Sequence, residues 1–335
     1  METQTAVVEP KRGRPLNQSV VLIALIVVIC IVTAIVNPRF LRIQNLINIF
    51  QQISILGIVA CGIGMLLVAG QIDISVGTQI SLMGVILSMI IQKMMGLPDG
   101  TAPAWQASLA IPTAFVVTFL IGIIIGIING LTVIYSRAAS FIITLGFSTA
   151  YHGAALLVSG GASYMLFNRF ELLGRGRILD IIPISILFFL GMVGLTFVVL
   201  RYFRYGRFLY AIGGNKKAAF VSGINTNRVT LIAYVVVGLC NALAALILIS
   251  RVGSALATTG DSFALDSLAA VIVGGVALSG GRGSALSIFL GVLLIGLITN
   301  ALIIMNVNPY VRDLVIGLII VGAVTVSELS GQKKA

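Results

Sequence analysis

This chain contains ten apolar stretches, and all but the eighth are long enough to cross a lipid bilayer alone. A transmembrane helix needs about 20 predominantly apolar residues, because each residue adds about 1.5 Å along the helix axis. The predicted helices lie at residues 19–36, 45–69, 73–92, 106–135, 140–159, 179–200, 229–250, 265–279, 284–305 and 310–327. The sequence therefore predicts an all-α polytopic membrane protein of about ten transmembrane helices.

The composition excludes a large water-soluble domain. Charged residues make up 9% of the 335 residues and hydrophobic residues 59%, whereas soluble domains carry about 25% charged residues. We predict an N-terminal tail at 1–18, a transmembrane domain at 19–327 and a C-terminal tail at 328–335, with one long hydrophilic loop at 201–228.

The distribution of basic residues predicts the orientation in the membrane. The formal net charge is +11, from 21 Lys and Arg against 10 Asp and Glu. Most of the basic residues fall in the termini and in every second loop, and such loops stay on the cytoplasmic side. We therefore expect both termini in the cytoplasm, and we explain the charge by topology rather than by nucleic-acid binding.

Two segments interrupt the apolar pattern with glycine and acidic residues. The stretch Ala257–Gly283 is rich in Gly, Ser and Thr, and backbone leaves the helix at membrane depth only where protein or a water-filled cavity surrounds it. We predict a broken or re-entrant segment there. The surroundings of Asp73 (AGQIDISVG) and of Asp261 and Asp266 (TTGDSFALD) also suggest a weak inverted repeat, as in many transporters.

The long loop contains signals for a short helix. Gly213 and Gly214 are expected to break the preceding segment, Asn215 is a good helix N-cap, and Gly223 ends the two turns between them. A short helix along the membrane surface fits this pattern. An ordinary solvated basic loop is the alternative.

No enzyme active site can be assembled from the sequence. His152 is the only histidine, so neither a histidine metal site nor a Ser-His-Asp set is expected. The three cysteines, Cys30, Cys61 and Cys240, lie in apolar runs without metal-ligand spacing. The GGRG sequence at 280–283 lacks the Gly-Lys-Ser/Thr ending of a phosphate-binding loop.

Polar residues within the predicted helices have two interpretations. Ionisable groups at membrane depth are costly and have a role, yet Asp73 is best explained as an N-cap of the third helix, and Asp266 fits a cap and a polar path equally well. Asn129, Thr144, Asn241 and Asn300 either line a path or bond between helices. Gly122, Gly126 and Gly130 share one helix face and are expected to pack closely against a neighbour.

Several motifs together resemble one family. They are AGQIDISVG at Ala69–Gly77, FIITLG at Phe141–Gly146, GGNKKAAFVSGI at Gly213–Ile224 and LDSLAAVIVGGVALSGGRG at Leu265–Gly283, with NPRF and QN elements at 37–45. These segments resemble the ribose-type monosaccharide permeases of bacterial ABC importers. The resemblance extends from about Val20 to Ser327, with four motifs in the expected order.

The resemblance implies a non-catalytic transport subunit of the bacterial inner membrane that works by alternating access. The implied partners are cytoplasmic ABC ATPase subunits, an extracytoplasmic sugar-binding protein and a second permease copy, identical or paralogous, and no nucleic acid. The chain itself would bind no cofactor or metal, because ATP and Mg are used by the ATPase.

The resemblance also assigns roles to residues. The loop that docks into the ATPase would comprise Gly213, Gly214, Asn215, Lys216, Lys217, Ala218, Ala219, Ser222 and Gly223. Family members usually have acidic or small residues in place of Lys216 and Lys217, which leaves the details of this contact open. The candidate residues for a pathway or a helix break are Asp73, Ser75, Asn129, Phe141, Thr144, Asp266 and Asn300.

Two alternatives remain open. Permeases for branched-chain amino acids or nucleosides share this architecture, and the DISVG motif with the GGN loop favours sugars over them. A proton-coupled secondary transporter would need a carboxylate in the middle of the membrane, for which Asp73 and Asp266 are the candidates. The sequence does not name the sugar.

Overall fold

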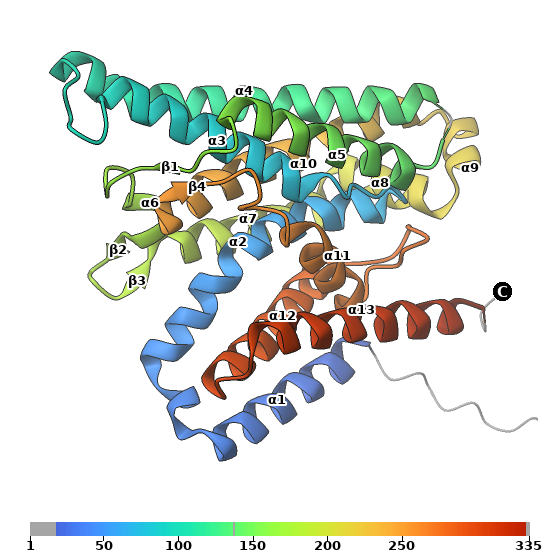
Figure 1. Cartoon of the computed structure of the whole chain (residues 1–335). Helices are drawn as coiled ribbons and strands as arrows, with labels where there is room; N and C mark the ends of the chain where they lie inside the picture. Colours follow the sequence, from blue (N-terminus) through green and yellow to red (C-terminus); the bar gives the residue numbers. More distant parts are fainter. Residues whose placement is uncertain (1–17, 137, 333–335) are drawn as a thin grey trace, which may run out of the picture.

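Long helices run side by side through most of the molecule in the computed structural model, which describes residues 18–136 and 138–332. Within these residues lie thirteen α-helices, one 3₁₀ helix and four short strands. Figure 1 shows α8 and α9 at one end of the long helices and all four strands at the other. We refer to these as the α9 end and the strand end.

The long helices follow the predicted apolar runs closely. Eight of the helices in the described residues are long and apolar enough to cross a membrane. The helices that fill the ten predicted segments are α1 (Gln18–Val36), α2 (Ile43–Val68), α3 (Val76–Met95), α4 (Ala104–Ser136), α5 (Ser140–Ser159), α7 (Ile184–Tyr202), α10 (Thr226–Val252), α11 (Phe263–Gly274), α12 (Ala285–Ile304) and α13 (Pro309–Gln332). The polytopic all-α architecture is thus confirmed.

The remaining elements are short and lie in the connections. They are the 3₁₀ helix η1 (Pro38–Leu41), the helices α6 (Leu172–Arg175), α8 (Arg204–Gly214) and α9 (Lys216–Val221), and the strands β1 (Tyr164–Met165), β2 (Arg177–Ile178), β3 (Ile182–Pro183) and β4 (Ser254–Ala255). Strand β1 pairs antiparallel with β4, and β2 with β3. Helix α8 was not predicted. Of the predicted tails, residues 1–17 and 333–335 lie outside the described residues, and α13 continues past 327.

Helices α2 and α10 form the centre of the bundle. The apolar stretch of α2 is 89% buried within the chain, whereas those of α1 and α5 are 11% buried. The largest apolar cluster gathers side chains from both central helices, including Ile58, Leu66 and Val237. Since the outer helices are apolar all round, their exposed faces suit lipid or another apolar protein surface.

Glycines bring α4 and α10 into close contact. A Cβ atom on Gly122 would lie 2.5 Å from the carbonyl oxygen of Gly238, and one on Gly126 would lie 2.6 Å from that of Tyr234. Gly130 faces Leu231 on the same helix α10. The predicted packing face of α4 is therefore confirmed, and its partner is α10.

The chain leaves the helical conformation at two places inside the bundle. Residues 69–75 connect α2 to α3, and Ser75 rather than Asp73 occupies the N-cap position of α3. Helix α11 has 12 residues, which span about 18 Å of the roughly 30 Å hydrocarbon core. Non-helical residues 256–262 complete that crossing from strand β4, so the predicted broken segment is confirmed.

Candidate functional site

The predicted short helix forms at the α9 end. The side chain of Asn215 accepts a hydrogen bond from the Ala218 amide at 3.0 Å, which caps the first turn of α9. The hydroxyl of Ser222 donates to the Ala218 carbonyl at 2.9 Å, and Gly223 ends the turn with φ of +84°. The predicted cap and stop of this helix are confirmed.

Helix α9 presents a mixed basic and apolar surface. Phe220 is 69% exposed and Val221 is 85% exposed, although sequence analysis had singled out only their neighbours. A hollow of about 470 Å³ next to them is lined by Phe220, Gly223, Ile224, Asn225, Thr226 and Asn227. Six basic residues in α9 and in the helices before and after it in the sequence are exposed: Arg201, Arg204, Arg207, Lys216, Lys217 and Arg228.

Three glycine segments meet behind α9 and form what we term the glycine junction, which comprises Gly70, Gly213, Gly214, Gly280 and Gly281. The Gly281 amide donates to the Val68 carbonyl at 2.9 Å. A Cβ atom on Gly213 would overlap that same carbonyl oxygen and the Gly281 nitrogen. A Cβ atom on Gly280 would lie 2.8 Å from the Gly70 Cα atom. At Gly213 and Gly280, only a residue without a side chain fits.

The junction connects three parts of the chain that are far apart in the sequence. Gly70 follows α2 at the first helix break, Gly213 and Gly214 end α8, and Gly280 and Gly281 lie in the connection from α11 to α12. Figure 1 shows these three ends close together beside α8. The end of α8, which leads into α9, is therefore in direct contact with the first helix break and with the α11–α12 connection.

A tyrosine strengthens this connection. The hydroxyl of Tyr210 in α8 donates a hydrogen bond to the Gly283 carbonyl at 2.7 Å. Burial raises the pKa of Tyr210, so its hydroxyl stays protonated and remains a donor at neutral pH. Helix α8 is thus fixed to the α11–α12 connection by a side chain as well as by backbone.

Asp73 lies in the first helix break and is 3% exposed. One of its carboxylate oxygens accepts hydrogen bonds from the amide, at 2.8 Å, and the hydroxyl of Ser75. The other accepts from the side-chain amides of Gln79 and Asn129, each at 3.1 Å. Four donors satisfy the buried carboxylate without a counter-charge from these residues.

The network around Asp73 extends to two further helices. The Tyr151 hydroxyl of α5 donates to the Asn129 amide oxygen at 2.6 Å, and the Asn241 side chain of α10 donates to the Gln79 amide oxygen at 2.7 Å. Thr144 approaches the same break, because the Ile74 amide donates to its hydroxyl at 3.2 Å. The network therefore holds the break against α4, α5 and α10.

The other candidate residues, Phe141, Asp266 and Asn300, lie outside the network around Asp73. Phe141 is exposed near the start of α5, and Asp266 is half-buried in the first turn of α11. Asn300 of α12 exchanges hydrogen bonds with Asn45 of α2 at 3.0 Å, so it joins two helices. The structure brings together Asp73, Ser75, Asn129 and Thr144, but not these three.

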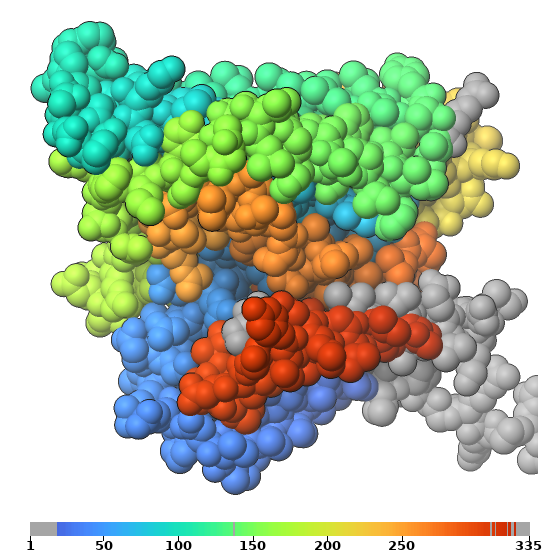
Figure 2. Space-filling view, viewed as in Figure 1, coloured from blue at the N-terminus to red at the C-terminus, as the bar shows by residue number. Residues whose placement is uncertain are grey.

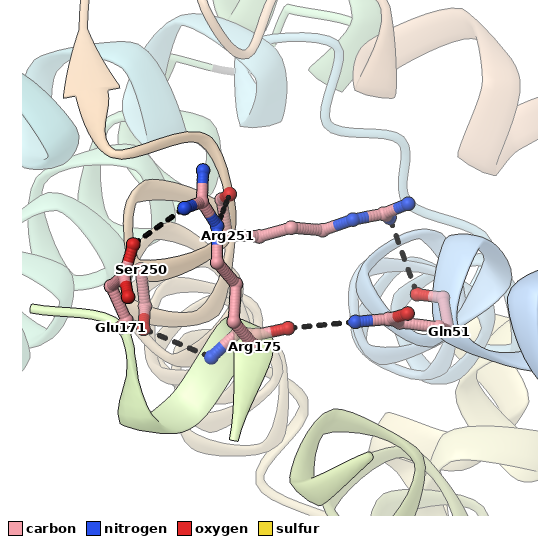
Figure 3. A network of polar contacts seen from close by, with 6 residues as sticks. Gln51, Glu171, Arg175, Ser250 and Arg251 are labelled. Atoms are coloured by element: carbon pink, nitrogen blue, oxygen red, sulfur yellow. Dashed lines mark hydrogen bonds and ion pairs between the residues drawn. The ribbon is translucent and has the colours of Figure 1, made fainter. Parts of the chain in front are cut away.

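A second polar network, absent from the sequence analysis, lies toward the strand end (Figure 3). The Gln51 side chain of α2 donates to the Gly174 carbonyl, and the Gly174 amide donates to the Ser250 hydroxyl, both at 2.9 Å. The Arg175 guanidinium donates to the Arg251 carbonyl at 2.9 Å and pairs with Glu171. Helix α6 is thereby tied to α2 and α10.

The comparisons with known proteins agree with this architecture. Residues 45–324 match the family model described as branched-chain amino acid transport system / permease component. The chain belongs to this permease family. It is accordingly a multi-pass membrane protein. No solved structure gives a significant match.

Curated relatives of this permease cover nearly its whole length. It is 37% identical over 300 residues to the ribose import permease protein RbsC of Bacillus subtilis, covering 89% of this chain and 88% of that one. It is 34% identical over 312 residues to RbsC of Escherichia coli K12, covering 91% and 92%. It is 32% identical over 320 residues to the galactose/methyl galactoside import permease protein MglC of the same strain, covering 92% and 94%.

Proposed function

We propose that this permease is the membrane subunit of an ATP-driven importer that carries a monosaccharide across the bacterial inner membrane. Its partners in this proposal are cytoplasmic ATPase subunits, an extracytoplasmic sugar-binding protein and a second permease copy. The permease binds no cofactor of its own, and the ATPase uses ATP and Mg. The observation that carries the proposal is the glycine junction, which connects an exposed surface helix to the first helix break and to the α11–α12 connection.

The junction supports alternating access by direct mechanical contact. Helix α9 offers an exposed aromatic side chain and a hollow to a docking protein. Since Gly213 contacts Val68 and Gly281 through backbone atoms, a pull on α9 moves the ends of α2 and of the α11–α12 connection together. Closely packed interfaces respond to such displacements by switching between discrete arrangements.

The names of the relatives favour a monosaccharide over the other solutes. The relatives that cover about nine tenths of the chain are named as permeases for ribose and for galactose. The family description names branched-chain amino acids, and that solute class is the alternative to test. No ring of fixed charge for ion selection occurs among the residues that the structure describes around the helix breaks.

Transport by the reconstituted complex tests the proposal. The permease is inserted into liposomes with its ATPase, and uptake of labelled ribose, galactose, leucine and adenosine is measured with the binding protein. We expect ATP-dependent uptake of one sugar and none of leucine or adenosine. Uptake that needs no ATP and collapses with a protonophore would instead establish the proton-coupled alternative.

Docking of the ATPase is expected to depend on Phe220. Phe220→Asp places a charge in the proposed apolar contact, and loss of such an anchor costs about 2 kcal/mol or more, an affinity loss of about thirtyfold. Co-purification of the ATPase and its titration onto the solubilised permease measure the effect. Phe220→Leu, which keeps an apolar side chain, should retain binding. Equal affinity of the Asp and Leu variants would contradict the docking role of α9.

The orientation is tested by two cysteines at opposite ends. In a variant with Cys30, Cys61 and Cys240 replaced, a cysteine at Lys216 on α9 should react with a membrane-impermeant thiol reagent only in inside-out vesicles. A cysteine at Asp180, in the turn between β2 and β3, should react only in right-side-out vesicles. The reverse pattern would place the termini outside.

A further inference from the structure

A polar hollow opens at membrane depth on the face of the bundle shown in Figure 2. It has a volume of about 370 Å³, and five of its lining side chains are polar: Thr78, Ser148, Thr149, His152 and Asp261. Its rim comes from α5 (green) and from the segment that leads into α11 (orange), which lie side by side in Figure 2. None of the functional assignments made above involves this hollow.

The hollow lies between the two ends of the membrane-spanning helices. Ser81, in the second turn of α3, accepts a hydrogen bond from the Gly260 amide at 2.8 Å and donates to the Asp261 carboxylate at 3.4 Å. Ser148 and His152 lie in the middle of α5. An exposed carboxylate and an imidazole at this depth are costly against lipid, so this face borders a water-filled space or a polar solute.

Close backbone contact fixes the carboxylate in this position. A Cβ atom on Gly77 would lie 2.7 Å from the carbonyl oxygen of Gly260 and 2.9 Å from that of Asp261. Since these glycines hold the start of α3 against the residues before α11, Asp261 cannot turn away with a flexible loop. Its side chain remains exposed toward the hollow.

The lining has the chemistry for a neutral solute rich in hydroxyl groups. Thr78 and Ser148 place their hydroxyl oxygens 3.5 Å apart, and hydroxyls both donate and accept. The Asp261 carboxylate accepts only, so it suits solute hydroxyls that donate. Neither Lys nor Arg is among the residues that line the hollow, so a phosphorylated solute has no cationic partner there.

We propose that this hollow is a contact site for an unphosphorylated polyhydroxylated solute on its way through the membrane, with Asp261 and Thr149 as its principal contacts. The proposal rests on the function proposed above and names where in this chain the solute is held. Asp261 precedes α11, whose other end leads into the glycine junction. Movement of α9 therefore changes the shape of the hollow.

Substitution in the complete transporter is the first test. With the ATPase, the binding protein and labelled ribose and galactose as probes, Asp261→Asn should lower sugar uptake about tenfold, the effect of losing one charge-assisted hydrogen bond. Thr149→Val should lower it less. Asp99→Asn, in the exposed connection between α3 and α4, is the matched control and should transport normally.

Thiol accessibility is the second test, and it does not depend on transport. In the assembled transporter lacking native cysteines, Thr149→Cys should react with a charged thiol reagent, and saturating sugar should slow the reaction. Leu120→Cys, on the exposed apolar face of α4, should not react. Resistance of Thr149→Cys would mean that a second copy covers this face without water, and would overturn the proposal.

The two proposals fail in different ways. If the wild-type complex imports a sugar and Asp261→Asn imports it equally well, the contact site is wrong and the proposed function stands. If the wild-type complex imports no sugar and Thr149→Cys is labelled without sugar protection, both fail.

Discussion

Replacing Gly213 by alanine is expected to lower transport by more than tenfold, whereas replacing Gly214 leaves it nearly unchanged. A Cβ atom on Gly213 would overlap the Val68 carbonyl oxygen and the Gly281 nitrogen, both of which are backbone atoms. Neither can rotate away as a side chain would, so the three segments of the junction must separate. Overpacking of this kind costs about 1–3 kcal/mol. Here it would distort the proposed connection of the ATPase to the first helix break and to the α11–α12 connection.

Gly214→Ala is a closely matched control for Gly213→Ala. It is the next residue in the same helix, and a Cβ atom placed on it meets nothing within 4 Å. Uptake and ATP hydrolysis of both variants are measured in the same liposomes, with the amount of inserted permease as a reference. We expect Gly213→Ala to hydrolyse ATP with little uptake. Equal uptake per ATP in both variants would show that the junction does not transmit the motion.

Most of the fold is predictable from the sequence because the bilayer imposes a length on each helix. Each of the ten apolar runs overlaps one of the long or broken helices, and the Gly-rich stretch that starts at Ala257 marks the broken one. Helix α8 was missed because Gly213 and Gly214 were expected to break it, while in the structure they end it. A glycine within a helix lowers the stability of that helix by only about 1 kcal/mol. Close packing of the end of α8 against the other glycine segments of the junction outweighs this loss.

The candidate site is only partly predictable, because the residues that contact one another in it are far apart in the sequence. Each glycine segment of the junction was noticed separately, but glycine indicates only that something approaches closely, not what approaches. Asp73 was expected to cap α3, and its actual partners include Asn129 of α4. Gln51 and Arg251 gave no local signal at all, since their contact depends on how α2 and α10 pack.

The central position of α2 relates the two polar networks to each other. Gln51, toward the strand end, bonds to the Gly174 carbonyl, and Val68, at the α9 end, accepts from Gly281. Because α2 is almost wholly buried and continuous between these points, it is the element that joins the glycine junction to α6 at the strand end.

Replacing Asp73 by alanine is expected to destabilise the permease more than any other single change at a polar residue considered above. The amide and the hydroxyl of Ser75 would lose their acceptor in a buried site, and the side-chain amides of Gln79 and Asn129 would keep only the Ser75 hydroxyl as acceptor. Each unsatisfied buried donor costs about 1–3 kcal/mol, so we expect a total loss of about 3–5 kcal/mol. Asp73→Asn keeps one acceptor oxygen but turns a donor toward other donors. Its loss of stability should therefore be smaller than that of Asp73→Ala.

Thermal unfolding of the solubilised permease measures these losses, and transport by the same variants distinguishes a structural carboxylate from a pathway carboxylate. Asp99→Ala, which changes an exposed carboxylate, should alter the free energy of unfolding by no more than about 0.5 kcal/mol. If Asp73 carried a coupled proton, Asp73→Asn would abolish transport and leave the unfolding temperature near that of Asp99→Ala. The four hydrogen bonds to the carboxylate predict a different result. Asp73→Asn should lower the unfolding temperature, and its transport should fall only in proportion to the amount of folded permease.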